Sequence, residues 1–179
     1  MTLSLHRPSV FTLWLFCSLH LTTWQVHAET PQQVRSAESQ NPIKIQADQL
    51  LVNEKMGVSR YQGNVVIEQG NMRLTGERIE ISHPNNALAK IEIHGSPANF
   101  TRKDPVTGSL TRGQAQTILY LAPTDTLTFI GNALVEENGK HKISGAKLLY
   151  NLQQQTLQAQ SDAQQQERVE VILMPNTGK

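Results

Sequence analysis

Six stretches of this chain alternate apolar and polar residues with a period of two, and this alternation sets the fold class. In the first, Ile43 and Ile45 face one way while Lys44 and Gln46 face the other. The six stretches are NPIKIQAD, VSRYQGNVVIEQ, ERIEIS, AKIEIHGSPANFT, TLTFIGNALVEE and RVEVILM. Strict alternation is typical of strands buried on one face. Gly-Asn, Gly-Ser, Pro-Asn and Asn-Gly pairs are expected to mark turns between them. Because no window carries a helical stripe, we predict an all-β protein.

The alternating pattern occurs in two copies along the chain. Gly63 and Gly131 lie 68 positions apart, and the same offset brings Leu50 onto Ile118. A smaller unit, a small residue followed by two spacers and two apolar residues separated by one, occurs in ADQLLV, GERIEI, AQTILY and GAKLLY. Repeats of this size build stacked β architectures in which each unit buries its apolar face on its neighbours. The sequence therefore predicts a solenoid-like internal repeat.

The first 28 residues have the pattern of a secretory signal peptide. A short segment ending in Arg7 precedes an apolar run of about a dozen residues, and the small-residue cleavage pattern ends at Ala28. The run is shorter than the roughly 18 residues of a spanning helix, although an uncleaved anchor is the alternative. A lipid anchor at Cys17 is not expected, because Phe16 stands where such signals need a small residue. We expect a signal peptide over 1–28, a flexible leader over 29–40, one β domain over 41–175 and a tail over 176–179.

Removal of the signal peptide changes the composition. The only cysteine and both tryptophans lie within it, so the exported chain has no disulfide to stabilise it. Its 15 basic and 15 acidic residues balance, because Arg7 is the only charged residue removed. A balanced charge argues against nucleic acid as a partner, since that binding needs a basic face. About 150 residues suffice for a single domain with its own core.

The sequence contains no recognisable catalytic apparatus. His83, His94 and His141 are far apart and lack metal-ligand spacing. No serine lies in a nucleophile-elbow pattern, and no glycine-rich phosphate loop is present. Glu136 and Glu137 are neighbours on a strand and would point to opposite faces. We therefore expect no enzyme, no cofactor and no metal site.

The inward-facing positions form a row of aliphatic and aromatic side chains instead. Two readings are open. The row fills a closed core, or the two sides of the sheet separate into a groove that would accept acyl chains.

Three short elements resemble the OstA-like family of lipopolysaccharide export proteins. They are PIKIQAD at residues 42–48, the GNV and GNA segments at 63–65 and 131–133, and the unit GERIEI at 76–81. Elements in matching order extend from Pro42 to about Pro175. The resemblance implies a β-jellyroll, folded like a taco, whose interior holds the lipid A part of lipopolysaccharide. It also implies a periplasmic protein that stacks head to tail into a bridge between the inner and outer membranes.

The resemblance assigns roles to residues and to partners. The P-I-x-I strand places Ile43 and Ile45 at the N-terminal edge, the P-A-x-F element makes Phe100 a lining residue, and Tyr120 follows from its repeat unit. With the alternation, the predicted groove comprises Ile43, Ile45, Val65, Ile67, Ile79, Phe100, Tyr120, Phe129, Val135 and Tyr150. The expected partners are lipopolysaccharide, an inner-membrane LptC-like component at the N-terminal edge and an outer-membrane LptD-like translocon at the C-terminal edge.

The ends of the sheet carry a further expectation. The first strand, with Ile43 and Ile45, and the last, with Val169, Val171 and Leu173, should each lack a neighbour on one side and join by strand addition. Head-to-tail contacts of this kind do not close and generate filaments. The alternatives are a structural fibre subunit with a closed core and no lipid ligand, a polysaccharide-active enzyme, and a membrane-anchored member of the same export system.

Overall fold

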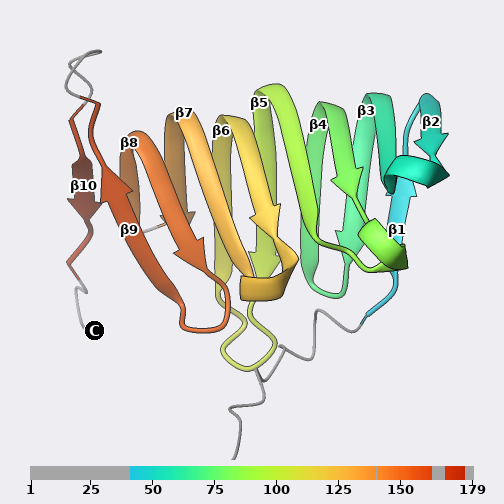
Figure 1. The fold of residues 1–179 in the computed structure, drawn as a ribbon. Coiled ribbons are helices and arrows are strands. Elements are labelled where there is room, and N and C mark those ends of the chain that lie inside the picture. Colours follow the sequence, from blue (N-terminus) through green and yellow to red (C-terminus); the bar gives the residue numbers. More distant parts are fainter. Residues whose placement is uncertain (1–40, 140, 163–167, 176–179) are drawn as a thin grey trace, which may run out of the picture. The chain divides into compact units, whose positions relative to one another are not determined.

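The computed structural model describes residues 41–139, 141–162 and 168–175, which all belong to one compact unit. The predicted signal peptide, leader and tail lie outside the described residues. Ten strands and three short 3-10 helices make up the fold (Figure 1). In chain order they are β1 (Ile43–Gln46), β2 (Gln49–Asn53), η2 (Glu54–Met56), β3 (Val58–Gln69), β4 (Met72–Ser82), η3 (Pro84–Asn86), β5 (Lys90–Lys103), β6 (Leu110–Leu121), η4 (Ala122–Thr124), β7 (Thr126–Glu137), β8 (His141–Asn151), β9 (Thr156–Gln160) and β10 (Glu170–Leu173). The all-β prediction is confirmed. No helix among the described residues is long and apolar enough to cross a membrane.

All ten strands form one antiparallel sheet, and from β3 to β8 each strand pairs with the next one in sequence. The order is β1-β3-β4-β5-β6-β7-β8-β10, with β2 also paired to β3 and β9 also paired to β8. β1 pairs with the second half of β3 and β2 with its first half. β10 and β9 divide β8 in the same way. Each end of the sheet is therefore a strand broken in two.

The sheet bends along a line that crosses the middle of every long strand. The pairing register shifts at this line in each of the five consecutive strand pairs from β3–β4 to β7–β8. Extra residues of this kind bend and twist a strand. We call this line the corner. The part of the sheet on the side of β1 and β10 is the β1–β10 wall, and the part on the side of β2 and β9 is the β2–β9 wall.

The glycines predicted to mark turns lie at this corner. Gly63 and Asn64 inside β3 have φ values of 81° and 46°, and Gly131 and Asn132 inside β7 have values of 78° and 49°. The prediction that these Gly-Asn pairs separate strands is wrong, as it also is for Gly95 and Ser96, which lie inside β5. A bulge and a hairpin turn can both need left-handed residues, so the dipeptide does not distinguish them. Asn138 and Gly139 do lie between two strands, β7 and β8.

The small residues at the first position of the four predicted repeat units also lie along the corner. Ala47, Gly76, Ala115 and Gly145 each lie at the corner or at the break that continues it. A Cβ on Gly76 would lie 2.7 Å from the carbonyl oxygen of His94, and one on Gly145 would lie 3.1 Å from that of Gln160. At Gly76 the neighbouring backbone therefore comes too close for any side chain, and at Gly145 it leaves little room for one.

The core lies between the two walls. Residues of alternate positions on both walls are buried there, and the largest are Tyr120, Phe100, Phe129, Ile67, Leu74, Ile79, Ile91, Ile93, Ile118, Leu127, Leu148 and Val65. Phe100 of the β1–β10 wall meets Phe129 and Tyr150 of the β2–β9 wall edge to face, with ring centroids 5.9 and 6.5 Å apart. Aromatic pairs at these distances add about 0.5–1.5 kcal/mol beyond their buried area. The walls are thus packed directly on each other.

Candidate lipid-binding interior and sheet edges

The structure places the ten predicted groove residues on the inner surface of the folded sheet. Eight of them are at most 8% exposed: Val65, Ile67, Ile79, Phe100, Tyr120, Phe129, Val135 and Tyr150. Ile43 and Ile45 on the edge strand β1 are half-buried and pack against this cluster. Within each wall the buried positions alternate with a period of two, as the sequence pattern predicted. Across the corner the inward positions of β5 change from odd to even, from Ile93 to Ala98, because the pairing register shifts there.

Side chains fill this interior. A cavity of about 130 Å³ opens between the walls, lined by Thr111, Val135, Glu137, His141, Ile143, Tyr150, Gln155 and Leu157. Ligand pockets usually measure about 300–1,000 Å³. Of the two sequence-based readings, the described conformation has the closed core. An acyl chain would enter only if the walls moved apart.

Polar side chains border the apolar core on the side opposite the corner, which we call the mouth. Gln69, Arg102 and Thr111 of the β1–β10 wall are buried there, and Asp125 of the β2–β9 wall is 3% exposed. Asp125 accepts hydrogen bonds from the Tyr120 hydroxyl (2.6 Å) and from Gln153 Nε2 (3.2 Å). The prediction omitted these residues although the alternation carries the signal, since Arg102 lies two positions after the inward-facing Phe100.

A hydrogen bond joins the two walls across the mouth. Gln155 Nε2, in the turn between β8 and β9, donates to Asp104 Oδ2 at the start of the loop between β5 and β6 (3.0 Å). The other oxygen of Asp104 accepts from the backbone N–H groups of Thr107 and Val106 at 2.7 and 2.9 Å. These two backbone donors lower the pKa of Asp104. Asp104 therefore stays ionised near neutral pH and holds both its own loop and the facing turn.

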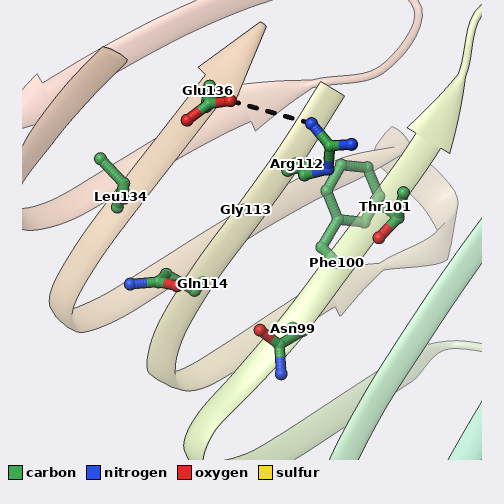
Figure 2. Close-up of a pocket in the computed structure, with 8 residues that line it drawn as sticks. All are labelled: Asn99, Phe100, Thr101, Arg112, Gly113, Gln114, Leu134 and Glu136. Carbon is green, nitrogen blue, oxygen red and sulfur yellow. Dashed lines mark ion pairs between the residues drawn. The ribbon is translucent and has the colours of Figure 1, made fainter. Parts of the chain in front are cut away.

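The outer face of the sheet has hollows of a different character. Figure 2 shows one of about 150 Å³ over β5, β6 and β7, where Asn99, Arg112 and Gln114 lie around the backbone of Gly113. Arg112 faces Glu136 at 3.8 Å, and Lys142 approaches the other Glu136 oxygen at 3.2 Å. Because these charged side chains pair across strands, the hollow is part of a solvated surface rather than an apolar groove.

Two of the described histidines contact neighbouring polar side chains. His83 Nε2 lies 2.8 Å from Ser59 Oγ, and His94 contacts Glu92 and Thr117. No group of three His, Cys, Asp or Glu side chains in residues 41–139, 141–162 and 168–175 could hold a metal ion.

Both ends of the sheet leave one side of their strands without a partner among the described residues, and both expose apolar side chains. On β2, Leu50 and Val52 are 57% and 47% exposed, and on β10, Val171 and Leu173 are 51% and 67% exposed. The predicted edge residue Val169 lies one position before β10 and is 39% exposed. Long apolar edges are normally avoided in monomeric proteins because they pair with other chains.

Fold and site together define a class of protein: a folded β-jellyroll with a continuous apolar interior that ends at two open, apolar sheet edges. Comparison with known proteins agrees with this class. The family model described as LptA/(LptD N-terminal domain) LPS transport protein matches residues 44–156.

Individual proteins named as components of lipopolysaccharide export are similar to this chain in sequence, and one of them is similar in structure. The lipopolysaccharide export system protein LptH of Pseudomonas aeruginosa is 29% identical over 124 residues, which cover 69% of this chain and 70% of that protein. LptA of Escherichia coli K12, named in the same way, is 27% identical over 164 residues, covering 90% and 86%. The crystal structure of LptH, described as the LptA-homologous periplasmic component of the lipopolysaccharide transport device, has a TM-score of 0.72, with 27% identity, over 77% of this chain and 99% of that one.

The chain belongs to the LptA/LptD N-terminal domain family of lipopolysaccharide transport proteins. The family resemblance and the jellyroll expected from the sequence are confirmed.

Proposed function

We propose that this protein is a non-enzymatic periplasmic carrier that shields the acyl chains of lipopolysaccharide between its two walls. The observation that carries the proposal is the apolar interior, which runs without interruption from Ile43 and Ile45 of β1 at one end of the sheet to Ile143 of β8 and Leu157 of β9 at the other. Burying one methylene group is worth roughly 0.8 kcal/mol, so a chain of about ten is worth roughly 8 kcal/mol. A lipid with several such chains needs a cover to cross water.

Loading requires the walls to separate at the mouth. The corner is continuous backbone and acts as the hinge, whereas the contacts to be broken are the ring contacts of Phe100 and the hydrogen bond between Gln155 and Asp104. Acyl chains then replace the contacts that the two walls make with each other. Because the exchange is apolar for apolar, its net free energy is small, and successive carriers of similar affinity would pass the lipid along without chemistry. The energy that drives lipid transport in one direction would be supplied by another component of the export system.

The two open edges supply the continuity that a relay needs. We propose head-to-tail assembly in which β9 and β10 of one copy meet β1 and β2 of the next, so that the sheets join by strand addition. The outermost N-terminal edge would meet an inner-membrane LptC-like component and the outermost C-terminal edge an outer-membrane LptD-like translocon. Export would follow cleavage of the signal peptide after Ala28, which N-terminal sequencing of the protein recovered from the periplasm would test.

Site-specific photo-crosslinking tests lipid binding. A photoreactive residue at Phe100 or Tyr120 would lie inside, and the same residue at the adjacent Asn99 or Leu119 would face outward as a matched control. We expect lipopolysaccharide adducts from the two inner positions only. Equal capture at inner and outer positions, or none at either, would exclude the proposed interior site.

A second candidate, a structural fibre subunit with a permanently closed core, is favoured by one observation, the filled interior. It predicts self-association through the same edges without any lipid adduct. The crosslinking experiment therefore separates the two candidates.

A further inference from the structure

The two sequence repeats are also two structural repeats, and their strand pairings match residue for residue. The pair Ile45–Ile67 between β1 and β3 becomes Gly113–Val135 between β6 and β7, 68 positions later. The correspondence extends to local backbone detail: η2 and η4 each end in a left-handed residue, Gly57 and Asp125, again 68 positions apart. The broken strand β1/β2 is therefore the first repeat's counterpart of the continuous strand β6.

The broken strand β9/β10 is the second repeat's counterpart of β5. This equivalence follows from the neighbouring strands β4 and β8, whose residues correspond with an offset of 69. In the first repeat Leu74 of β4 pairs with Phe100 of β5. In the second repeat the equivalent residue, Ile143 of β8, pairs with Val171 of β10. Applied along both walls, the same step makes β9 the counterpart of the first half of β5 and β10 the counterpart of its second half.

The junction between the two repeats within one chain is the pairing of β5 with β6. It is antiparallel and bends at the corner, and it contributes the register pairs Arg102–Thr111, Phe100–Gly113, Ile93–Ile118 and Ile91–Tyr120. Within the described part of the chain, the first repeat lacks a β5-like neighbour before β1/β2, and the second lacks a β6-like neighbour after β9/β10. The edge strand β9/β10 therefore corresponds to the β5-like neighbour that β1/β2 lacks, and β1/β2 corresponds to the β6-like neighbour that β9/β10 lacks.

We infer that the junction between successive copies reproduces the β5–β6 junction. The edge strands of two copies therefore pair in one defined register. This inference rests on the head-to-tail assembly proposed above and adds its register and its inner contacts. Replacing each residue of the internal junction by its counterpart gives the antiparallel pairs between copies. They are Ile43 with Leu173, Ile45 with Val171, Leu50 with Ala159, and Val52 with Leu157.

The side chains at these positions fit the register. All eight belong to the inward-facing rows. Five of their partners within the chain, such as Ile143 for Val171 and Tyr61 for Leu50, belong to the core or pack on it, and the other three of the eight lie two positions along the same strand from one of these five. All eight are apolar, whereas the internal junction has Arg102 opposite Thr111 at its mouth end. An interface that forms after folding must bury apolar area to be stable. The two edges are thus more apolar than the internal β5–β6 junction to which they correspond.

The alternative registers fit less well. A slip by one residue places inward-facing positions opposite outward-facing ones, so Lys44 would stand opposite Val171 or Leu173. In the inferred register Lys44 stands opposite Ile172 on the outer face, and its diagonal neighbour is Glu170, an opposite charge within reach. The interior then continues from one copy into the next without a polar gap, as the relay requires.

Paired cysteines test the register, because β1 and β10 lie at opposite ends of the sheet and cannot be bridged within one chain. In a Cys17→Ser background, the double variant Ile45→Cys with Val171→Cys should form disulfide-linked ladders on mild oxidation. The pair Leu50→Cys with Ala159→Cys tests the other wall independently, in case one variant fails to fold. Directly opposed residues lie about 4.5–5.5 Å apart, which suits a disulfide.

Shifted pairs are the controls. Ile45→Cys with Leu173→Cys is displaced by two residues on the same face, and Ile45→Cys with Ile172→Cys by one. We expect them to remain largely monomeric on denaturing gels. Light scattering of the same samples distinguishes a wrong register from a failure of the copies to assemble. Oligomers that crosslink through the shifted pairs, or through no pair, would overturn the register and leave assembly standing. The absence of oligomers at all concentrations would overturn head-to-tail assembly itself.

Discussion

The ring of Phe129 on one wall occupies the space that a side chain at Gly113 would need on the other. A Cβ built on Gly113 would lie 2.4 Å from Phe129 Cε1 and 2.6 Å from Cζ. Because Phe129 is fully buried, its ring has no solvent-filled space into which to retreat. Gly113 thus fixes how closely the walls approach in the closed conformation.

We expect Gly113→Ala to lower the free energy of unfolding by about 1–3 kcal/mol, the usual cost of an extra methyl group in a packed core. Urea denaturation would measure it. Combining Gly113→Ala with Phe129→Leu should cost less than the sum of the two single changes, because the smaller side chain makes room for the methyl group. Additive costs would show that the two residues do not compete for the same space.

The hydrogen bond from Tyr120 to Asp125 supports the polar border of the mouth. Tyr120→Phe keeps the ring in the core and removes the donor at 2.6 Å from the buried carboxylate. A hydrogen bond to a charged group contributes about 1.5–3 kcal/mol, so unfolding by urea should become easier by that amount. Tyr61→Phe is the matched control, since Tyr61 is only partly buried. A similar loss in both variants would argue against a specific role for the Tyr120 hydroxyl.

Much of this molecule follows from its alternation. A period of two assigns inward and outward faces, and within each wall the inward positions are the buried ones, as Ile91 and Ile93 show on β5, because they bury apolar area. The corner was not predictable from the same pattern. Gly63 and Asn64 need left-handed backbone whether they end a strand or bend it, and only the register with β4 shows that the strand continues.

Two other features depend on distances that no local pattern carries. Asp104 and Gln155 are 51 positions apart and meet because the walls fold together. Whether the interior is open or filled depends on the spacing of the walls, which the side chains of both walls set jointly. Alternation and family resemblance together therefore placed ten residues on the inner face, and neither could show that side chains fill the interior.

Glu92 on the outer face of β5 gives a pH-dependent contribution. The hydrogen bond from Lys90, at 3.0 Å, is the largest cause that lowers the pKa of Glu92 below its ordinary value of 4.5. Because the folded-state pKa lies below the unfolded one, ionised Glu92 stabilises the protein above about pH 4.5, and this stabilisation is lost as the pH falls through the folded-state pKa. About a third of both side chains is exposed, so the contribution is about 0.2–1 kcal/mol.

Urea unfolding of wild type and Glu92→Gln at several pH values would measure this contribution. The two proteins should differ at pH 7 and converge as the pH falls below the folded-state pKa of Glu92. In a Lys90→Met background the pH-dependent difference should shrink, since the main cause of the shift has been removed. A difference that does not change with pH would show that Glu92 acts through packing rather than through its charge.

The two oxygens of Asp104 serve separable tasks at the mouth. Asp104→Ala removes the acceptor for the amides of Val106 and Thr107 and also the contact with Gln155. Gln155→Ala removes only the contact across the mouth. Hydrogen exchange should therefore accelerate at both loop amides in the first variant and remain slow in the second, while the amide of Phe100 stays protected in both. Loss of protection in Gln155→Ala would mean that the facing turn, and not Asp104, orders the loop.

Adjacent residues of β10 offer the sharpest test of how copies meet. Val171 is on the inner face and Ile172 on the outer face, and their exposed fractions are similar, 51% and 43%. In the inferred register Val171→Glu would bury a carboxylate against Ile45, whereas Ile172→Glu would place one beside Lys44. An uncompensated buried charge costs about 3 kcal/mol or more, so Val171→Glu should weaken self-association roughly a hundredfold or more.

Ile172→Glu should assemble about as well as wild type, and better at low salt, because exposed charge pairs are screened as ionic strength rises. Light scattering over a range of protein concentrations would compare the variants, with circular dichroism to verify that each is folded. Equal weakening in both would show that the edge loses affinity through added charge alone, without regard to face. A sheet that continues from one copy into the next with its two faces preserved predicts weaker self-association for Val171→Glu and unchanged self-association for Ile172→Glu.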